Sequence, residues 1–387
     1  MSLFKAPISI TGISSISGIG SGLQSVSEAY KNDEHYLSFG AIGNQKVWLG
    51  ELSDCDKCAI KELKASNPKY RSLDNSVLYA IQASRNAVEN SGWSENSDFG
   101  INIGSSRGAT ALFENYHKTY VETGSTATLT SPTTTLGNIS SWVAQDLKNR
   151  GPAISHSITC STALHALLNG VAWIKGGMAD KFLVGGSEAP LTPFTIAQMR
   201  ALKIYSKSNE AYPCRAFDLN KKQNTMVLGE GAAMACLERS NSTNALARII
   251  GVGYATEQLQ HSVSISAEAL CFQDSMKMAL GEVEAEEVDV IVMHAPGTIK
   301  GDASEMAALK KVFPEKLPFL TTNKWKVGHT FGASGMLSVE MAIVMLINQN
   351  PIAVPFVEYE SFPGRIRKVM VNAVGFGGNA VSILLSR

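Results

Sequence analysis

The sequence predicts an α/β protein made of two related halves, and three observations support this. Short β-branched or apolar runs alternate with stretches of helical periodicity along all 387 residues. No low-complexity linker divides the chain. Two glycine-rich turns that each lead into an apolar strand, "LGEGAAMACLE" (228–238) and "VGFGGNAVSILL" (374–385), each close about half of the protein. The segment after the first turn, "ALARIIGVGYATE", also resembles the early "APISITGISSIS", so we expect halves spanning 1–240 and 241–387.

The individual elements follow from hydrophobic periodicity. The expected strands, in chain order, are "ISITGI", "FGINIG", "KFLVGG", "ARIIGVG", "VDVIVMHA" and "KVMVNAVGFGG". The expected helices are 74–91, 162–176, 266–280, 303–312 and 335–348. Strands that alternate with helices in this way favour buried sheets covered by helical layers.

Composition excludes several classes of function. Lysine plus arginine and aspartate plus glutamate number 34 each, so no overall charge favours nucleic acid or an anionic membrane. We see no apolar run near the roughly 20 residues that cross a bilayer. The stretch "MSLFKAPISITGISSISGIG" lacks the long apolar segment and cleavage site of an export signal. We therefore expect a cytoplasmic protein without nucleic-acid or membrane partners.

Cysteine usage agrees with a reducing compartment. The six cysteines are too sparse for a disulfide framework: Cys55, Cys58, Cys160, Cys214, Cys236 and Cys271. "CDKC" at 55–58 has the spacing of a metal site, but no second cysteine pair or nearby histidine pair completes one. We interpret this pair as incidental and expect no metal.

Cys160 occurs where a β-rich run gives way to a helical one, in "SHSITCSTALHALLNGVAWIKGG" (155–177). A cysteine at a helix N-terminus is near unpaired N–H groups and the positive end of the helix dipole, which favour the thiolate. A small buried hydrophobe is the alternative, since that is the usual fate of a free cysteine. The stretch alone fits a nucleophile and a core residue equally.

Two of the seven histidines lie in glycine-rich loops that follow apolar strands. They are His294 in "VDVIVMHAPGTIKGD" and His329 in "TTNKWKVGHTFGASG". Ligands of α/β proteins bind at loops on the carboxyl ends of strands. Two such histidines together with Cys160 favour a catalytic site, whereas we interpret His156 and His165 as structural.

These motifs together resemble the β-ketoacyl-[acyl-carrier-protein] synthases of the thiolase-like superfamily. The resemblance covers essentially the whole chain. Five segments carry it in the right order: "GPAISHSITCSTALHAL", "RAFDLNKKQNTMVLGEGAA", "HAPGTIKGDASE", "NKWKVGHTFGASG" and the terminal "GFGGN". The resemblance implies a thiolase-like fold with five layers, αβαβα.

The resemblance also implies roles for particular residues. Cys160 would accept the acyl group, His294 and His329 would promote decarboxylation, and Lys324 would be the active-site lysine. The backbone N–H groups of Cys160 and Phe376 would form an oxyanion hole, with Phe376 gating the acyl pocket. Two imidazoles point to the elongating branch, which condenses an acyl group with malonyl-ACP and needs no metal or redox cofactor.

Further contacts implied by the resemblance concern substrate and partners. Substrate binding would involve Thr298, Gly375 and Gly377. An acidic acyl carrier protein would dock on four basic residues: Lys61, Lys64, Lys69 and Arg71. The strand "GPAISHSIT" (151–159) would pair across a two-fold axis, giving a homodimer or a heterodimer with a homologous subunit.

The chain departs from the family pattern in four places. Pro296 replaces a threonine expected two residues after His294, and Ser338 replaces a glutamate, with Glu340 two positions further on. The loop from Asp218 to Gly229 is about two residues longer and lacks Arg-Asp-Gly. The segment "EQLQHSVSISAEAL" is short. These changes leave substrate and chain length open.

Three alternatives to bulk fatty-acid elongation follow. The chain could be the condensing subunit of a specialised polyene or polyketide pathway, possibly paired with a homologous subunit. It could be a non-catalytic partner resembling a chain-length factor, although such proteins lose the nucleophile that this chain retains. A thiolase would carry a second cysteine near the C-terminus, where "AVGFGGNAV" has none.

Overall fold

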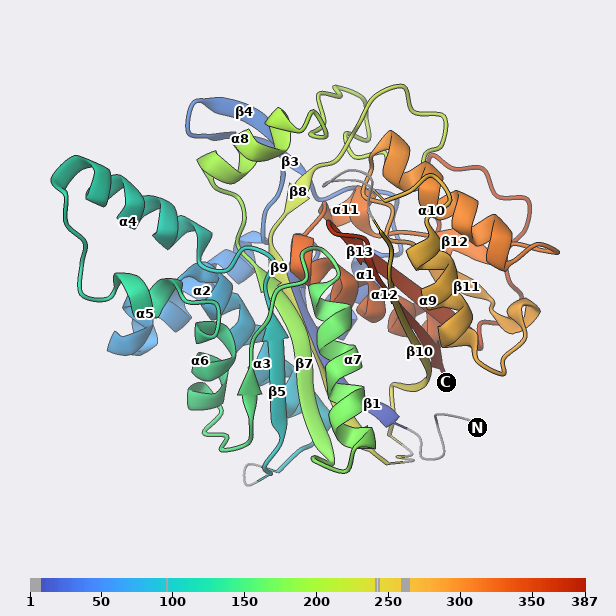
Figure 1. Ribbon diagram of the computed structural model, residues 1–387, viewed down its shortest axis with the longest axis horizontal. Helices are drawn as coiled ribbons and strands as arrows, with labels where there is room; N and C mark the ends of the chain where they lie inside the picture. The colour runs from blue at the N-terminus through green and yellow to red at the C-terminus, as the bar shows by residue number, and fades with distance from the viewer. Residues whose placement is uncertain (1–7, 95–96, 241, 243, 259–264) are drawn as a thin grey trace.

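The computed structural model describes residues 8–94, 97–240, 242, 244–258 and 265–387 (Figure 1). Eleven of the described strands form one mixed sheet. Its two five-strand blocks have the same order and the same directions. The first block runs β1 (Ile8–Ser17), β9 (Gly231–Arg239), β7 (Lys181–Glu188), β5 (Gly100–Gly104) and β6 (Ala153–Ile154). The second runs β10 (Ala247–Thr256), β14 (Asn379–Ser386), β13 (Lys368–Gly375), β11 (Val290–Val292) and β12 (Phe319–Thr321).

The two blocks meet where β1 pairs antiparallel with β10, and Ile8 lies opposite Ile249. In each block the first two pairings along this order are antiparallel and the last two are parallel, so the third strand has one neighbour of each kind. Short β2 (Gly20–Ser21) pairs with β1. A separate small sheet consists of β3 (Ser38–Ile42), β4 (Gln45–Gly50) and β8 (Leu228–Gly229).

Three buried apolar clusters alternate with the two blocks to give five layers. The outer cluster of the first block involves α2 (Asp54–Ser66), α3 (Asn75–Ser91) and α6 (Asn138–Asp146). The central cluster contains α7 (Thr162–Lys175) and α12 (Ser334–Asn348), which contact strands of both blocks. The third covers the second block with α9 (Leu270–Leu280) and α10 (Ile299–Val312), at the right of Figure 1. The five-layer αβαβα architecture is thus confirmed.

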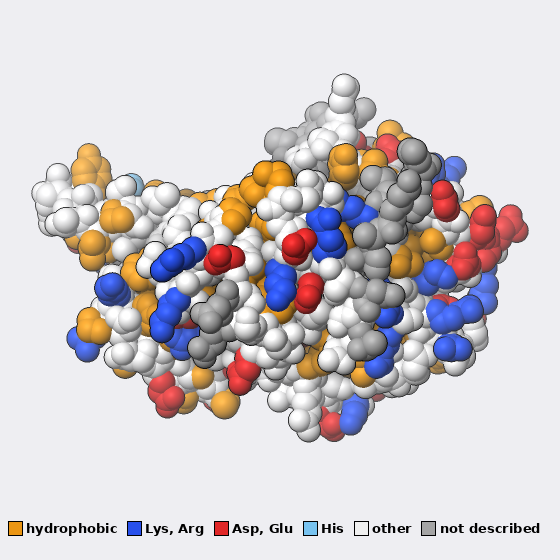
Figure 2. All heavy atoms as spheres, turned by 90° about the horizontal axis from the view of Figure 1, so that it is seen from below, with side chains coloured by type: hydrophobic (Ala, Val, Ile, Leu, Met, Phe, Trp, Pro, Cys, Tyr) orange, Lys and Arg blue, Asp and Glu red, His pale blue; other side chains and the backbone are white. Residues whose placement is uncertain are grey.

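The remaining described helices are short or peripheral. They are α1 (Leu23–Ala29), α4 (Thr110–Thr123), α5 (Thr130–Thr134), α8 (Pro193–Ala201), α11 (Lys324–Val327) and the 3-10 turns Pro68–Ser72, Ala285–Glu287 and Phe331–Ala333. Helix α4 buries none of its described side chains and projects from the body, and this projection carries hydrophobic side chains at the left of Figure 2.

Three sequence expectations need correction. The strand expected over 151–159 is limited to Ala153–Ile154, because the chain turns out of the sheet before Thr159, whose φ is 47°. The helix expected from 266 begins at Leu270. One apolar stretch, Phe331–Asn348, does have the length and composition of a membrane span, but 89% of it is buried inside the protein, where it forms a 3-10 turn and the core helix α12.

Two glycines on β10 allow α9 to pack directly against the sheet. A Cβ added at Gly253 would collide with the carbonyl oxygen of Ser275, and one at Gly251 with that of Ala279. Both oxygens belong to α9. The outermost helical layer of the second block therefore depends on the absence of side chains at these positions.

We expect Gly253→Ala to lower the free energy of unfolding by ~1–3 kcal/mol, because α9 must move off the sheet. The urea midpoint measures this. Gly137→Ala is the control, since nothing lies within 4 Å of its Cβ position and its φ of −57° suits alanine. Equal midpoints for the two variants would contradict close packing of α9 on β10.

Candidate active site

A cavity of about 490 Å³ lies where loops of the two blocks meet. It brings together Cys160 from the first block and His294 and His329 from the second. Thr298, Gly375, Phe376 and Gly377 also line it. Residues separated by up to 217 positions in the sequence thus share one pocket, as the family resemblance implies.

Cys160 is held in a tight turn immediately before α7. The Thr162 hydroxyl donates to the Thr159 carbonyl at 2.6 Å and accepts from the Ile158 N–H at 2.9 Å. Ser161 is the N-cap, so the thiol lies two residues before the first helical residue. The side chain is buried apart from the face that it presents to the cavity.

Burial dominates the electrostatics of this thiol. Burial first, and then the nearby Glu188 carboxylate, raise the pKa of Cys160 to about 12 against the opposing charges of Lys324 and Arg107. The thiolate expected from the helix N-terminus is therefore not the resting form. The desolvation of a buried charge outweighs the dipole of α7.

Glu188 and Arg107 were not identified from the sequence. The buried Glu188 carboxylate accepts hydrogen bonds from the Ser106 and Gly332 N–H groups, and burial raises its pKa to about 7. Its Oε2 atom has no partner among the described residues. The Arg107 guanidinium lies 5.2 Å from the centre of the Phe331 ring, which lines the cavity. A polar residue at the end of an apolar strand, as in "KFLVGGSE", was the available signal for Glu188.

His294 follows β11, and a carboxylate from α10 fixes its backbone. Glu305 accepts from the N–H groups of His294 at 2.9 Å and Ala295 at 2.8 Å. Ala295 has a φ of 29°, which places the loop in a sharp turn. Asn372 on β13 donates to the same carboxylate at 3.4 Å.

His329 is fixed by backbone pairing with the small sheet. Its N–H donates to the Val227 carbonyl at 2.7 Å, and its carbonyl accepts from the Gly229 N–H at 3.1 Å. The rings of His294 and His329 are 5.3 Å apart, edge to face at 82°. Because the two imidazoles come from separate loops, this contact depends on the packing of both.

Both imidazoles are neutral at neutral pH. Burial lowers the pKa of His294 and of His329 well below the ordinary value, and the charge of Lys324 adds to both shifts. The Nδ1 atom of each ring is buried without a hydrogen-bond partner among the described residues. The rings thus retain hydrogen-bonding capacity that the surrounding protein does not use.

Lys324 begins α11 and is only 1% exposed. Burial lowers its pKa to about 8, against the opposing charges of Glu305 and Cys160. It does not line the cavity itself, but its charge acts on the thiol and on both histidines. The role of Lys324 as the active-site lysine stays a prediction.

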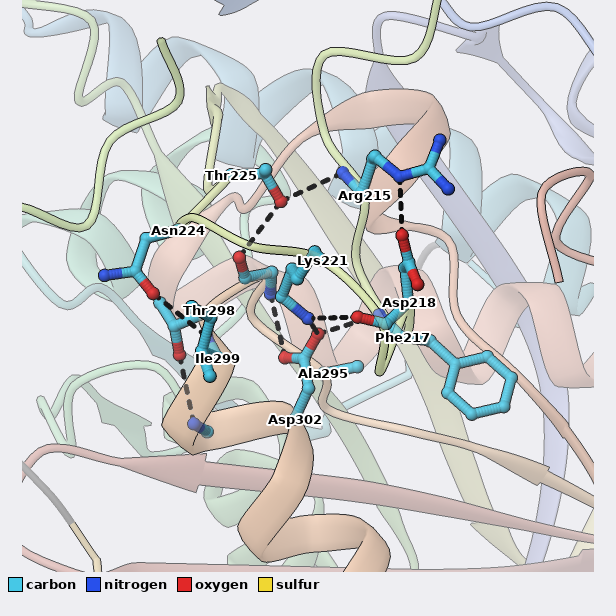
Figure 3. Close-up of polar contacts among 12 residues, drawn as sticks. Arg215, Phe217, Asp218, Lys221, Asn224, Thr225, Ala295, Thr298, Ile299 and Asp302 are labelled. Carbon is cyan, nitrogen blue, oxygen red and sulfur yellow. Dashed lines mark hydrogen bonds and ion pairs between the residues drawn. The ribbon is translucent and has the colours of Figure 1, made fainter. Parts of the chain in front are cut away.

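The longer loop after Asp218 clamps the loop of His294 (Figure 3). The Lys221 ammonium pairs with the Asp302 carboxylate at 2.6 Å, and both side chains are almost fully buried. The same carboxylate accepts from the N–H groups of Gly297 at 3.0 Å and Phe217 at 2.8 Å. Lys221 thus supplies a buried cation although the family's Arg-Asp-Gly is missing from this loop.

Two residues of this loop, Asn224 and Thr225, form hydrogen bonds with the backbone on either side of Thr298. Thr225 donates its N–H and its hydroxyl to the Gly297 carbonyl, and Asn224 accepts from the Ile299 N–H at 2.9 Å (Figure 3). Thr298 caps α10 by accepting from the Gly301 N–H at 3.2 Å. Asn224, Pro296 and Thr298 all line the cavity, so the longer loop contributes polar groups near the missing threonine hydroxyl.

Gly375 lets the C-terminal loop approach the turn of Cys160. A Cβ at this position would collide with the Thr159 hydroxyl and lie 2.8 Å from the Ile158 carbonyl oxygen. The Thr159 hydroxyl donates to the Phe376 carbonyl at 3.4 Å. The backbone of Phe376 is thereby held beside that of Cys160, and the Phe376 ring is 39% exposed at the cavity.

Of the two other departures, Ser338 and the nearby Glu340 lie away from the cavity lining, whereas Ile265 of the short segment 257–270 lines the cavity. Glu340 accepts from the Ser15 hydroxyl at 2.5 Å on β1, and burial raises its pKa to about 7. Glu340 is thus held in the core beside β1 and is not among the residues that line the cavity. The short segment 257–270 is described only in part, because residues 259–264 lie outside the described residues.

The four basic residues expected to dock a carrier protein lie apart from the cavity lining. Lys61, Lys69 and Arg71 are exposed and Lys64 is half-buried, on α2 and the 3-10 turn after it. The CDKC pair also lies on α2, and both of its cysteines are exposed and free. Within the described residues there is no cluster of histidine, cysteine and acidic side chains that could hold a metal ion.

Comparison with known proteins agrees with this arrangement. Residues 6–243 match the family model "Beta-ketoacyl synthase, N-terminal domain", and residues 246–359 match "Beta-ketoacyl synthase, C-terminal domain". A 3-oxoacyl-[acyl-carrier-protein] synthase 2 from Coxiella burnetii is 28% identical, with 99% of each chain covered. Nodulation protein E from Rhizobium meliloti is 27% identical, with 96% of this chain and 97% of the relative covered.

Solved structures share the fold at lower identity. The ishigamide ketosynthase/chain length factor superimposes with a TM-score of 0.83 at 20% identity, covering 98% of this chain and 99% of that one. A type II PKS ketosynthase solved in complex with its acyl-carrier protein superimposes with a TM-score of 0.86 at 18% identity, with the same coverage. With both family models matched across most of its length, this chain belongs to the β-ketoacyl synthase family.

Proposed function

We propose that the protein is a 3-oxoacyl-[acyl-carrier-protein] synthase, an acyltransferase that condenses an acyl thioester with malonyl-ACP. The observation that carries this proposal is the meeting of Cys160, His294 and His329 in one cavity, with the two imidazoles 5.3 Å apart. Family membership and full-length relatives named 3-oxoacyl-[acyl-carrier-protein] synthase 2 support it.

In the first half-reaction the Cys160 sulfur attacks the carbonyl of the incoming acyl thioester. The carbonyl oxygen gains negative charge, which the N–H groups of Cys160 and Phe376 stabilise as an oxyanion hole. The carrier sulfur takes up the proton that Cys160 has lost and leaves as a thiol, and the acyl group remains on Cys160. Lys324 assists, because its charge favours the thiolate that the buried site otherwise disfavours.

In the second half-reaction a malonyl thioester loses carbon dioxide. The electron pair of the broken C–C bond passes into an enolate, whose oxygen accepts hydrogen bonds from His294 and His329. Neutral imidazoles can fill this role, because each carries one ring N–H that can donate a hydrogen bond to the enolate oxygen. The enolate carbon then attacks the acyl-Cys160 carbonyl, the sulfur leaves and is reprotonated, and a 3-oxoacyl thioester is released. Thr298, Gly375 and Gly377 would contact the substrate at the cavity wall.

We further propose that the protein works as a dimer in the cytoplasm, either a homodimer or a pair with a homologous subunit. Helix α4 exposes apolar side chains, including Phe113 at 63% and Val121 at 69%, and β6 lies at an unpaired edge of the sheet. Such surfaces favour coverage by a partner. All six cysteines are free, which suits a reducing compartment.

Lys61, Lys64, Lys69 and Arg71 are proposed as an electrostatic contact for the carrier protein. None of the four forms an ion pair with another described residue, although the charge of Lys64 acts on the buried Asp74 carboxylate.

We also propose that the chain divides into two domains at residue 240, with the nucleophile in 1–240 and both histidines in 241–387. The repeated strand order of the two blocks supports this division.

We expect His294→Ala and His329→Ala each to slow decarboxylation about 10²–10³-fold, because each removes a donor to the enolate oxygen. Carbon dioxide release from malonyl-ACP is measured after Cys160 has been acylated. His117→Ala, on the exposed α4, is the control and should behave as the wild type. Unchanged release in both active-site variants would contradict the proposed function.

Alkylation of Cys160 by iodoacetamide should depend on Lys324 and Glu188 in opposite directions. Lys324→Met removes a cation that lowers the pKa of the thiol, so alkylation at pH 7 should slow about tenfold per unit of pKa. Glu188→Gln removes a carboxylate that raises the same pKa, so alkylation should become faster. The effect of Lys324→Met should shrink above pH 8, where Lys324 itself loses its charge.

Peptide mass spectrometry over pH 6–10 measures these alkylation rates at Cys160 alone. Cys160→Ala is the blank, and it should also abolish condensation. Shifts of the same sign in the Lys324→Met and Glu188→Gln variants would contradict the electrostatic account of the nucleophile.

The oligomeric state tests the proposed partner surface. Light scattering at micromolar concentration should give about twice the chain mass of 41.4 kDa, or a stable complex with a homologous subunit. Phe113→Asp combined with Val121→Asp should weaken this association, because both place a charge in the covered apolar surface. A wild-type protein that is monomeric alone and with such a subunit would refute the dimer.

A further inference from the structure

A lysine that the mechanism above does not use is buried two residues after Lys324. The side chain of Lys326 is fully buried, in the single turn of α11 that Lys324 begins and that leads to His329. It forms no ion pair with another described residue. Burying an ammonium is costly unless hydrogen bonds replace its water, so the partners of this group need to be identified.

Four oxygen atoms surround the Lys326 ammonium. The carbonyl oxygens of Ala29, Asn32 and Glu34 accept hydrogen bonds from it at 2.8, 2.9 and 2.7 Å. The side-chain oxygen of Asn32 accepts a further one at 3.0 Å. We call these four oxygens the lysine cage.

Aromatic rings and acidic residues lie around the lysine cage. The ammonium is 4.7 Å from the centre of the Trp325 ring and 5.3 Å from that of Tyr36, within reach of cation–π attraction. Burial lowers the pKa of Lys326 to about 8, while the charges of Asp33 and Glu34 act in the opposite direction. The group is therefore charged at neutral pH, which suits a cage made of hydrogen-bond acceptors.

The lysine cage organises a segment that has no helix or strand of its own. Residues 30–37 join α1 to β3, and carbonyls at positions 29, 32 and 34 all point at one nitrogen atom. The Tyr36 N–H also donates to the Lys326 carbonyl at 2.8 Å, so the segment is tied to α11 twice. Carbonyl groups gathered in this way can replace the hydration shell of a monovalent cation. Lys326 thus fills such a site with a cation that is attached to the chain.

The segment around the lysine cage also contacts the approach to the His294 loop. The Asp33 carbonyl accepts from the Tyr212 hydroxyl at 3.0 Å. The Tyr212 ring packs edge-on against Trp325, with the ring centres 5.9 Å apart. Tyr212 leads into the loop after Asp218, which clamps the loop of His294. The cage is therefore joined to one histidine through α11 and to the other through Tyr212.

We propose that Lys326 is a positioning residue, a tethered cation whose cage holds Lys324 and His329 in place for the reaction. The inference rests on the proposed function and adds a residue that touches no substrate. Without the cation, carbonyl oxygens of the cage would lose their hydrogen-bond partner, and segment 30–37 would separate from α11. The turn that carries Lys324 would then shift relative to Cys160.

The first test replaces the tethered cation by a free one. Lys326→Ala removes three methylene groups and the ammonium, and propylammonium has the same atoms. We expect kcat for a small pantetheine thioester to fall about 10–100-fold, because misplaced catalytic groups slow the reaction steeply. Propylammonium chloride should restore most of this loss in a saturable manner. Tetramethylammonium chloride at the same ionic strength should restore none, because it has no N–H to donate.

Two variants act as controls. Lys326→Met removes the same charge but fills the space of the stem, so it should lose activity and gain nothing from propylammonium. Lys31→Ala removes an exposed lysine of the same segment, which pairs with the exposed Glu28. This variant should behave as the wild type with and without propylammonium.

Alkylation of Cys160 by iodoacetamide separates this inference from the proposed function, because it needs no condensation. Lys326→Ala should slow alkylation at pH 7, since the displaced charge of Lys324 would no longer lower the pKa of the thiol. Propylammonium should restore the rate. If alkylation responds in this way while the wild type does not condense its substrates, the proposed function fails and the positioning role stands.

The urea midpoint distinguishes positioning from folding. Propylammonium that raises the midpoint of Lys326→Ala without restoring kcat or the alkylation rate would make Lys326 a purely structural residue and overturn the proposal. Wild-type kcat in Lys326→Ala would also overturn it. Equal restoration by tetramethylammonium would do the same, because the effect would then be one of ionic strength.

The exposed Asn32 provides a second test that holds even if Lys326→Ala does not fold. Asn32→Ala removes one oxygen of the lysine cage and should lower kcat severalfold, about what one hydrogen bond to a charged group contributes. Asn32→Asp keeps an oxygen at this place and should lose less. Equal kcat in the two Asn32 variants would contradict a role for the cage in positioning the active site.

Discussion

Two buried carboxylates on α10 hold the active site together. Asp302 and Glu305 lie one helical turn apart and accept hydrogen bonds from the N–H groups of His294, Ala295, Gly297 and Phe217. The cost of burying these carboxylates is offset by Lys221 for Asp302 and by the nearby charge of Lys324 for Glu305. The His294 loop, the loop after Asp218 and the start of α10 therefore form one unit. A change in any of the three leaves a buried carboxylate without one of its partners.

Burial also determines which protonation states the site uses. It raises the pKa of Cys160 and lowers those of both histidines, so these three groups are uncharged at neutral pH, whereas Lys324, whose pKa is lowered only to about 8, keeps its charge. A resting thiol and neutral imidazoles protect the site from unwanted alkylation and from binding stray anions. Charge develops only when a substrate supplies an oxyanion for the N–H groups and imidazoles to stabilise.

Much of the fold and of the active site could be predicted from the sequence, because the residues that the chemistry requires lie in recognisable motifs. Hydrophobic periodicity located α7 and α12 to within a residue or two, and the five segments in order placed Cys160, His294 and His329. Glu188 and Lys221 were missed, since each depends on contacts between segments distant in sequence. The thiolate expected at the start of α7 was wrong because periodicity reports a helix end but not how deeply it is buried.

The position of β1 has a consequence for how the chain is made. This strand lies in the middle of the sheet, and its partners are β9 and β10, with Ile8 opposite both Arg239 and Ile249. A ribosome adding about 5–20 residues per second needs roughly 12–50 s to reach those partners after β1 emerges. During that time a strand of ten residues, all buried in the finished protein, has no sheet to join. The growing chain thus presents a substrate for chaperones, and closing loops of more than 200 residues makes assembly of the central sheet a late step of folding.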